Sequence, residues 1–369
     1  MTTIAATPRV RELRVQRGLT QAALADLAGI ARQSLIAIES GRATPSVAVA
    51  IAVARALEAT VEALFAGDAP APEAAIDVEL LAPAADDRVA ITAIDGRWIA
   101  APLELGDGRG RMIAADGVLI ARGRGGAAAI EPLRARAALE DGVLLVGCAP
   151  ALGLVADRLN AARGPGRFTW IGRSSSAALH DLAARRAQVV GVHFGGDDER
   201  TLARVRRALP GRDLLVIGLV AWEAGLALRP GAARPRALEE LGRPGVRLAL
   251  RERGAGIQRL FEAAWRRRGA AAPATAALHA RGHLEAAQAV ALGAADAGLT
   301  IASAARRYGL DLLPLGRERF DLVIDRRDAD DPRIARLLEG LSDGRIRRAL
   351  AAAGDDAGPC GDARRLVAA

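Results

Sequence analysis

The sequence predicts a multi-domain protein with an all-α N-terminal domain, a small β-rich insert and an α/β C-terminal domain. Residues 10–65 carry apolar positions at helical spacing, with capping residues and glycine stops between them. Apolar residues then alternate around an Asp-Gly pair within residues 76–130, which is typical of a β-hairpin. Beyond residue 142, short apolar strands alternate with helical segments, and this pattern favours an α/β architecture.

These patterns place the domain boundaries. Residues 1–66 form the helical domain, and 67–75 form a Pro-rich and Ala-rich linker with no apolar period. The β-rich subdomain covers 76–130, and the α/β domain covers 131–369.

The second helix of the N-terminal domain has clear start and stop signals. Thr20 is a suitable N-cap, and Gly29 permits the positive φ that ends the helix. Between them, Leu24, Leu27 and Ala28 fall at helical spacing, and we expect all three to face the core.

A third helix is predicted to begin near Ala31, with Leu35 and Ile38 as its buried stripe. That stripe leaves Arg32, Gln33 and Ser34 on the exposed first turn. Arginine can pair bidentately with guanine and glutamine with adenine, so this turn has the chemistry needed to read bases.

Several spaced motifs in this region resemble the lambda-repressor/Cro (XRE) family of five-helix, helix-turn-helix DNA-binding domains. They are Gly-Leu-Thr-Gln at 18–21, Ala-Gly-Ile at 28–30 and Ile-Glu-Ser-Gly at 38–41. The resemblance implies binding to double-stranded operator DNA, with Arg32, Gln33 and Ser34 at the base edges. Gln21, at a helix N-terminus, and Arg42 are expected at phosphates. The resemblance also implies a structural pair of Arg14 with Glu39.

In the β-rich insert, Val89, Ile91 and Ala93 alternate with other residues, Asp95-Gly96 predicts a two-residue turn, and 98–103 returns as the partner strand. A further strand is expected at 118–121, followed by a glycine-rich flexible loop around Gly123. The sequence shows no chemistry here, so the insert is interpreted as a small β-subdomain or spacer.

The α/β domain begins with an apolar strand at 143–146, and the expected elements then alternate along the chain. Further strands are expected at 168–171, 189–194, 214–221, 246–250 and 278–280, and helices at 152–159, 177–184, 257–267 and 284–292. A weak internal echo links helix 177–184, which leads into Val-Val-Gly-Val-His, with helix 284–292, which leads into Ala-Asp-Ala-Gly-Leu-Thr. This repetition predicts two lobes joined by crossing strands, with hinges expected near 218–221 and 298–301.

Particular motifs of this domain resemble the type 2 periplasmic-binding-protein-like domain, molybdate-binding type, that some bacterial regulators carry fused to a DNA-binding module. They are Gly-Cys-Ala-Pro-Ala-Leu-Gly-Leu at 147–154, the serine run 174–176, Gly-Val-His at 191–193, Gly-Ala-Gly at 254–256, and Ala-Asp-Ala-Gly-Leu at 295–299. The resemblance implies a bilobal α/β fold that binds a small ligand, such as molybdate or tungstate, between its lobes. The family often has Thr-Arg where this chain has Ile257-Gln258, so Arg253 and Arg259 are the candidates to replace that guanidinium.

Turns rich in Gly, Ser and Ala precede four of the expected helices, at 147–150, 172–176, 253–256 and 282–283. Each turn presents free backbone N–H groups at the positive end of a helix dipole, which suits an anion. The candidate ligand-binding residues are Ser174, Ser175, Ser176, Gly254, Ala255, Gly256 and His283. Ordinary helix capping remains the alternative role for the serines and for His283.

Composition narrows the function classes. All 51 basic residues are arginine, and the net charge is +8; residues 1–65 contribute +2, from seven Arg against five acids. No apolar run reaches the roughly 20 residues that span a bilayer, and the N-terminus lacks signal-peptide features. We therefore expect a cytoplasmic protein that does not contact membranes, with Cys148 and Cys360 reduced.

No nucleophile motif, phosphate loop or metal-ligand spacing is evident, so neither an enzyme, a cofactor nor a metal site is expected. The sequence thus predicts a ligand-responsive transcriptional regulator that binds operator DNA as a homodimer and senses a small anion. Three alternatives stay open. They are a small-molecule storage protein, a regulator of a non-oxyanion metabolite, and an enzyme on the binding-protein fold.

Overall fold

The computed structural model describes residues 9–65, 74–83, 86–103, 113–195, 198–231, 237–252, 254–267 and 276–367. The chain divides into two compact units, Met1–Glu73 and Ala74–Ala369. Residues 67–73 of the expected linker and Arg253 lie outside the described residues. No helix within the described ranges is long and apolar enough to cross a membrane.

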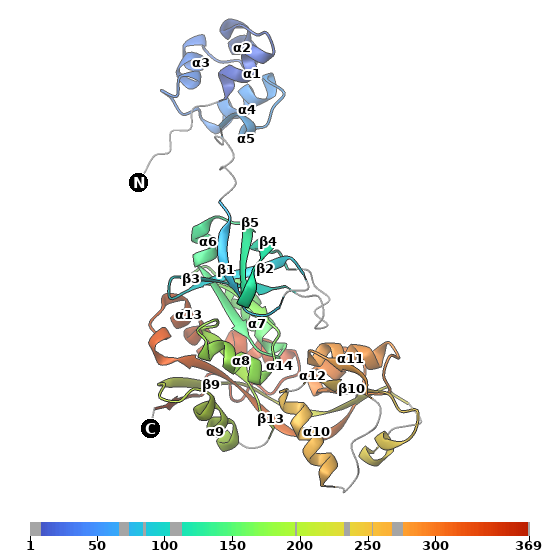
Figure 1. The fold of residues 1–369 in the computed structure, drawn as a ribbon. Coiled ribbons are helices and arrows are strands. Elements are labelled where there is room, and N and C mark those ends of the chain that lie inside the picture. The colour runs from blue at the N-terminus through green and yellow to red at the C-terminus, as the bar shows by residue number, and fades with distance from the viewer. Residues whose placement is uncertain are drawn as a thin grey trace. The chain divides into compact units, whose positions relative to one another are not determined.

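The first unit is helical, as predicted (Figure 1). Its helices are α1 (Val10–Gln16), α2 (Gln21–Ala28), α3 (Arg32–Glu39), α4 (Val47–Ala56) and α5 (Val61–Phe65). The Thr20 hydroxyl accepts a hydrogen bond from the Ala23 N–H, and Gly29 ends α2 with a φ of 62°. The predicted N-cap and C-terminal stop of α2 are therefore both confirmed.

The buried stripe of this unit differs from the prediction at one position. Leu24, Ala28, Leu35 and Ile38 lie in its core, but the Leu27 side chain is 63% exposed. The buried face of α2 is centred between Leu24 and Ala25, about 100° apart on the helix. Leu27 falls roughly 110° from that centre, so spacing from Leu24 alone placed it wrongly.

The β-rich insert is a closed barrel with strand order β1-β3-β2-β4-β5. Its elements are β1 (Ile76–Leu80), β2 (Arg88–Ile94), β3 (Arg97–Pro102), β4 (Gly117–Arg122), the short helix η1 (Arg124–Gly126) and β5 (Ala127–Pro132). The predicted turn is present, with positive φ at both Asp95 and Gly96. The glycine-rich segment is a single 3₁₀ turn between β4 and β5.

The barrel is packed onto the α/β domain. One hydrophobic cluster joins Ile94 and Ile99 of the barrel to Leu144 and Leu179 of the α/β domain. The Thr92 hydroxyl also donates to the Gly142 carbonyl at 2.6 Å. Of the two interpretations, small β-subdomain or spacer, the spacer is wrong, because the barrel shares a hydrophobic core with the α/β domain.

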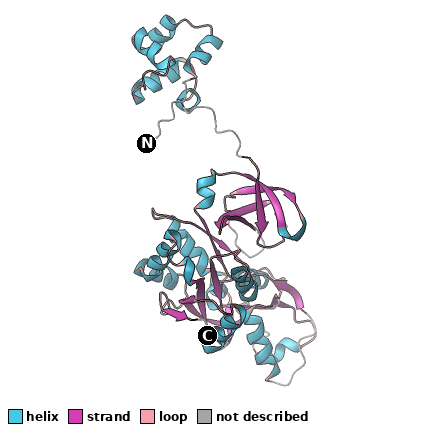
Figure 2. Ribbon diagram, turned by 60° about the vertical axis from the view of Figure 1, so that its left-hand side comes forward, coloured by secondary structure: helices cyan, strands magenta, loops and turns pink. Residues whose placement is uncertain are grey.

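The α/β domain contains the remaining elements (Figure 2). The helices are α6 (Arg136–Glu140), α7 (Ala151–Asn160), α8 (Ser175–Ala183), α9 (Asp198–Ala208), η2 (Leu238–Gly242), α10 (Gly256–Arg266), α11 (His283–Ala291), α12 (Ala302–Arg307), η3 (Arg326–Asp328), α13 (Pro332–Ser342) and α14 (Gly344–Ala352). The strands are β6 (Gly142–Val146), β7 (Arg167–Ile171), β8 (Val189–Val192), β9 (Leu214–Leu228), β10 (Leu248–Arg251), β11 (Ala276–Ala280), β12 (Ala297–Ile301), β13 (Asp311–Asp325) and β14 (Ala363–Leu366).

Two lobes with the same strand arrangement make up this domain. In lobe 1 the order is β7-β6-β8-β13, and in lobe 2 it is β11-β10-β12-β9. In each lobe the first three strands of this order are parallel to one another. The fourth strand pairs antiparallel with the third. The weak sequence echo is therefore a real repeat of one βαβαβ unit.

Strands β9 and β13 cross between the lobes and pair with each other over their whole length, from Asp311↔Leu228 to Asp325↔Leu214 (Figure 1). The first crossing continues beyond the predicted strand 214–221. The hinge expected near 298–301 is wrong, because β12 pairs only with β9 and β10 inside lobe 2. The chain returns between the lobes in β13, for which the apolar pattern gave no signal.

Candidate functional site

The candidate ligand-binding turns meet between the two lobes. Parallel strands point their carboxyl ends at one edge of a sheet, where ligands of open α/β folds bind. The turns 172–176 of lobe 1 and 254–256 of lobe 2 follow such strand ends. The Ser176 hydroxyl donates to the Gly254 carbonyl at 3.3 Å, so the two predicted segments touch.

The three serines have different roles. Ser174 caps α8 by accepting from the Ala177 N–H, and the fully buried Ser175 accepts from the His193 N–H at 3.1 Å. Ser176 faces the other lobe, where its hydroxyl accepts from the Arg259 guanidinium at 3.1 Å. Of the three hydroxyls, that of Ser176 is the one bonded across the lobes.

The glycines of lobe 2 allow this close approach. Gly254 has a φ of 98°, a conformation that L side chains rarely adopt, and Ser174 and Ser176 lie directly over it. A Cβ on Gly256 would lie 2.6 Å from the His193 ring. Ala255 is the N-cap of α10 and makes no side-chain cap bond, so the first turn of α10 keeps its N–H groups available.

A basic group accompanies these turns. Arg259 and Arg204 both lie over the Phe194 ring, at 5.4 and 5.3 Å from its centroid. Burial and the charge of Arg204 lower the pKa of Arg259. One terminal nitrogen of Arg259 is buried without a hydrogen-bond partner among the described residues.

His283 is also at the lobe interface but belongs to a different group of contacts. It is the first residue of α11, 1% exposed, and its ring centroid is 5.7 Å from that of His193. The buried Arg251 guanidinium lies 3.2 Å from its Nδ1. Burial and the Arg251 charge hold the pKa of His283 well below its usual value.

A buried polar cluster surrounds His193. Its Nε2 lies 3.2 Å from the Cys148 sulfur, and its Nδ1 lies 2.9 Å from the Glu318 carboxylate. Trp222 donates to the same carboxylate from the paired position of the other crossing strand. Burial would lower the pKa of His193, but Glu318 and Cys148 raise it to about 10. His193, Trp222 and Arg251 outweigh burial and lower the pKa of Glu318.

The sequence contains no close-spaced metal-ligand motif, but the fold brings three possible ligand side chains together at this point. Cys148, His193 and His283 present ligand atoms within 4.8 Å of one another. Sequence spacing hid the cluster, since Cys148 and His193 are 45 residues apart. Only the position of each residue at the end of a predicted strand or the start of a helix could have suggested it, and Glu318 had no such signal.

A cleft reaches this region from outside. It has a volume of 940 Å³ and is lined by residues of both lobes, including Pro150, Trp170 and Leu284. The same three residues border a small pocket against Cys148 and His283.

The candidate DNA-contacting residues lie on α2, α3 and the turn after α3. Arg32, Gln33 and Ser34 are exposed on the first turn of α3, as expected for groups that meet a partner. Arg42 is exposed and donates to the Ser40 hydroxyl at 2.9 Å.

Gln21 is half-buried at the start of α2. Its amide donates to Glu39, which also accepts from Arg14 at 2.6 Å, so the implied Arg14–Glu39 pair is confirmed.

Comparisons with known proteins agree with this division. A family model described as a PBP superfamily domain matches residues 156–342, about half of the chain, and a helix-turn-helix model matches 10–64. An uncharacterized HTH-type transcriptional regulator of Archaeoglobus fulgidus is 38% identical over 60 residues, which cover 16% of this chain and 86% of that protein. The uncharacterized protein YvgK of Bacillus subtilis is 27% identical over 158 residues, or 41% of this chain and 51% of YvgK.

Among solved structures, a putative phosphate ABC transporter substrate-binding protein of Clostridium perfringens is similar in fold, and the match covers 58% of this chain and 99% of that protein. It is 11% identical, with a TM-score of 0.44.

The two family matches show that the chain belongs to the family described as the PBP superfamily domain and that it carries a helix-turn-helix domain at its N-terminus.

Proposed function

We propose that this chain is a ligand-responsive transcriptional regulator. Its helix-turn-helix domain binds operator DNA, and its bilobal domain senses a small anion of the molybdate or tungstate type. It acts in the cytoplasm as a homodimer on a near-palindromic operator with half-sites about 34 Å apart. Arg32, Gln33 and Ser34 contact bases, while Arg42 contacts a phosphate. Gln21 does so through its backbone N–H at the start of α2, since its amide is bonded to Glu39.

The single observation that supports anion sensing is a buried terminal nitrogen of Arg259 at the lobe interface, which has no hydrogen-bond partner within the described part of the chain. Arg204 shares the ring of Phe194 with it, so two cations stand close together. The Ser176 hydroxyl, once turned from the Gly254 carbonyl, and the uncapped first turn of α10 add donors beside them. An anion there relieves the repulsion between the guanidinium groups and accepts from donors of both lobes.

The test is calorimetric titration of the full-length protein with molybdate, tungstate, sulfate and phosphate. Charge-assisted hydrogen bonds contribute about 1.5–3 kcal/mol each, so Arg259→Gln and Ser176→Ala should each weaken binding about tenfold or more. Arg266→Gln is the matched control, because Arg266 is exposed at the other end of the same helix.

Two outcomes of this titration would contradict the proposal. Full affinity in Arg259→Gln, with the tryptophan fluorescence of the folded protein retained, means that the anion does not bind here. Binding of none of the four anions contradicts the oxyanion part of the proposal and favours a different metabolite.

A further inference from the structure

We propose that Cys148, His193 and His283 bind a transition-metal ion of soft or borderline character, such as Zn²⁺ or Cu⁺, between the two lobes. The proposal goes beyond anion sensing and does not depend on it, because Arg259, Ser176 and the first turn of α10 take no part in it. Thiolate and imidazole are the ligands that such ions select.

The ligand set is assembled by the fold from three separate segments. Cys148 lies in the turn between β6 and α7, His193 directly follows β8, and His283 begins α11. Their exposed fractions are 3%, 0% and 1%, and their ligand atoms lie within 4.8 Å of one another. Metal–ligand bonds of about 2.0–2.3 Å need these atoms closer, by an inward movement on the order of 1 Å.

His193 already has the outer contact typical of a metal ligand. A ligating histidine usually donates its second ring N–H to a carboxylate, which fixes the tautomer and the ring orientation. Here Nδ1 is 2.9 Å from Glu318, and Nε2 faces the Cys148 sulfur at 3.2 Å. Trp222 in turn holds Glu318 from the neighbouring crossing strand.

His283 supplies the independent observation. Its Nε2 is buried and has no hydrogen-bond partner among the described residues, although buried polar atoms are nearly always paired. In the metal-free state Arg251 donates to Nδ1, which places the ring proton on Nε2. With an ion on Nε2 that proton belongs on Nδ1, and Arg251 keeps the carbonyl oxygens of Ala280 and Arg281 as acceptors.

The origin of the ligands gives the site a mechanical consequence. Cys148 and His193 belong to lobe 1, whereas His283 belongs to lobe 2. An ion held by all three therefore stabilises the closed arrangement of the lobes. It also replaces the proton shared by Cys148 and His193, so binding releases about one proton per ion.

The experiment is titration of full-length, chelator-treated protein with Zn²⁺ by calorimetry, and with Co²⁺ followed by its thiolate charge-transfer absorption. One ion per chain is expected, with the charge-transfer band lost in Cys148→Ser. Cys360→Ser is the matched control, since Cys360 is the other buried cysteine of the chain. His283→Gln should weaken Zn²⁺ binding at least tenfold, while His279→Gln, at an exposed histidine, should leave it unchanged.

A second variant tests metal binding without removing any of the three ligand side chains. Glu318→Gln keeps all three ligands and should weaken Zn²⁺ binding about 10–100-fold through the lost outer contact. Proton uptake or release is read by repeating the calorimetry in buffers of different ionisation enthalpy. Absence of stoichiometric binding, or a Co²⁺ spectrum without a thiolate band in the folded wild type, overturns the proposal. Both readouts are made without DNA or oxyanions, so their failure is distinct from failure of the anion site.

Discussion

At the scale of single residues, some polar side chains of the helix-turn-helix domain are bonded to one another, whereas others are exposed to solvent and are candidates for contact with DNA. Arg14 and Glu39 form a buried pair, and the Gln21 amide is already bonded to Glu39. Arg32 has no such hydrogen bond to another described residue and is exposed at the start of α3. The same short helix therefore carries both a structural carboxylate and the candidate base-reading turn.

Arg32→Ala should cost about 1–3 kcal/mol of operator binding and relax the preference at one base pair, because a bidentate contact to guanine is lost. The measurement is a binding titration on an operator selected from random sequences and on unrelated DNA. Arg42→Ala serves as the comparison, since loss of a phosphate contact weakens both DNAs alike. Equal losses for Arg32→Ala on both DNAs would remove Arg32 from base reading.

Glu39 makes the stability of this domain sensitive to acid. Burial would raise the pKa of Glu39, but the hydrogen bonds from Arg14 and Gln21 lower it. A lowered folded-state pKa means stability that is fully present above the ordinary glutamate pKa and is lost as the pH falls through the folded-state value.

The helical circular dichroism signal should therefore fall on acidification, and tryptophan fluorescence reports separately on the second unit, because all four tryptophans lie beyond residue 73. Glu39→Gln should flatten this acid dependence. Glu58→Gln, which breaks an exposed pair with Arg17, should leave it in place. An unchanged acid profile in Glu39→Gln would show that another group controls the transition.

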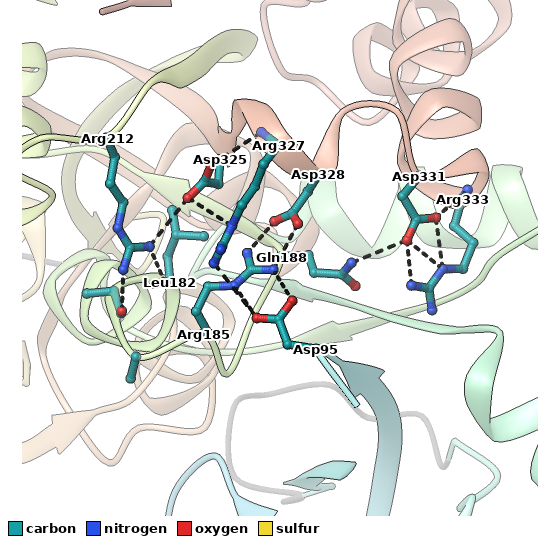
Figure 3. A network of polar contacts seen from close by, with 12 residues as sticks. Asp95, Leu182, Arg185, Gln188, Arg212, Asp325, Arg327, Asp328, Asp331 and Arg333 are labelled. Atoms are coloured by element: carbon teal, nitrogen blue, oxygen red, sulfur yellow. Dashed lines mark hydrogen bonds and ion pairs between the residues drawn. The ribbon is translucent and has the colours of Figure 1, made fainter. Parts of the chain in front are cut away.

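At the scale of elements, a network of charges fastens the barrel to lobe 1 (Figure 3). Arg185 follows α8, and its guanidinium bonds both Asp95 of the β2–β3 turn and Asp328 of η3. Asp95 and Asp328 outweigh the effect of burial and raise the pKa of Arg185. Arg185 also has a positive φ, so surrounding contacts must hold its backbone.

Arg185→Met should destabilise residues 74–369 by about 3–5 kcal/mol, because Asp328 is left as a buried charge without its partner. Methionine keeps a long apolar stem and a side chain at the same strained φ, so the charge is the main change. Urea unfolding followed by tryptophan fluorescence measures the loss. Arg327→Met, at a half-exposed arginine of the same network, should cost less than about 1 kcal/mol. Similar losses for the two variants would contradict the buried-charge argument.

At the scale of the whole molecule, β9 and β13 are the only described strands shared by both lobes, so closure must bend them. The register shifts at Pro314/Gly316 and Phe320/Asp321 mark where the ladder is irregular. Glu318 and Trp222 lie between these shifts, beside the buried polar cluster. The proposed metal site therefore adjoins the stretch of the crossing strands that a hinge closure would bend.

Ligand and operator should affect each other equally. A ligand that favours one lobe arrangement and thereby changes operator affinity does so by a coupling free energy of typically about 1–3 kcal/mol, and linkage requires the reciprocal change in ligand affinity. Ligand titrations with saturating operator, with unrelated DNA and without DNA measure it. Identical dissociation constants in all three would show that the bilobal domain does not regulate DNA binding.

The sequence by itself determined the features that depend on local chemistry. Thr20 and Gly29 bounded α2, Asp95-Gly96 closed the hairpin, and small residues marked the turns at 172–176 and 254–256. Each follows from backbone preferences within a few residues, which a single chain reveals. The echo between the two α/β repeats was readable for the same reason.

Only the tertiary structure decided what these segments meet. Strand β13, the common core of barrel and lobe 1, and the exposure of Leu27 depend on packing partners that the local pattern does not specify. The joining of Cys148, His193, His283 and Glu318 has the same origin, because crossing strands and a repeated lobe bring together positions far apart along the chain. Local preferences act over a few residues, whereas such a cluster exists only once the lobes are assembled.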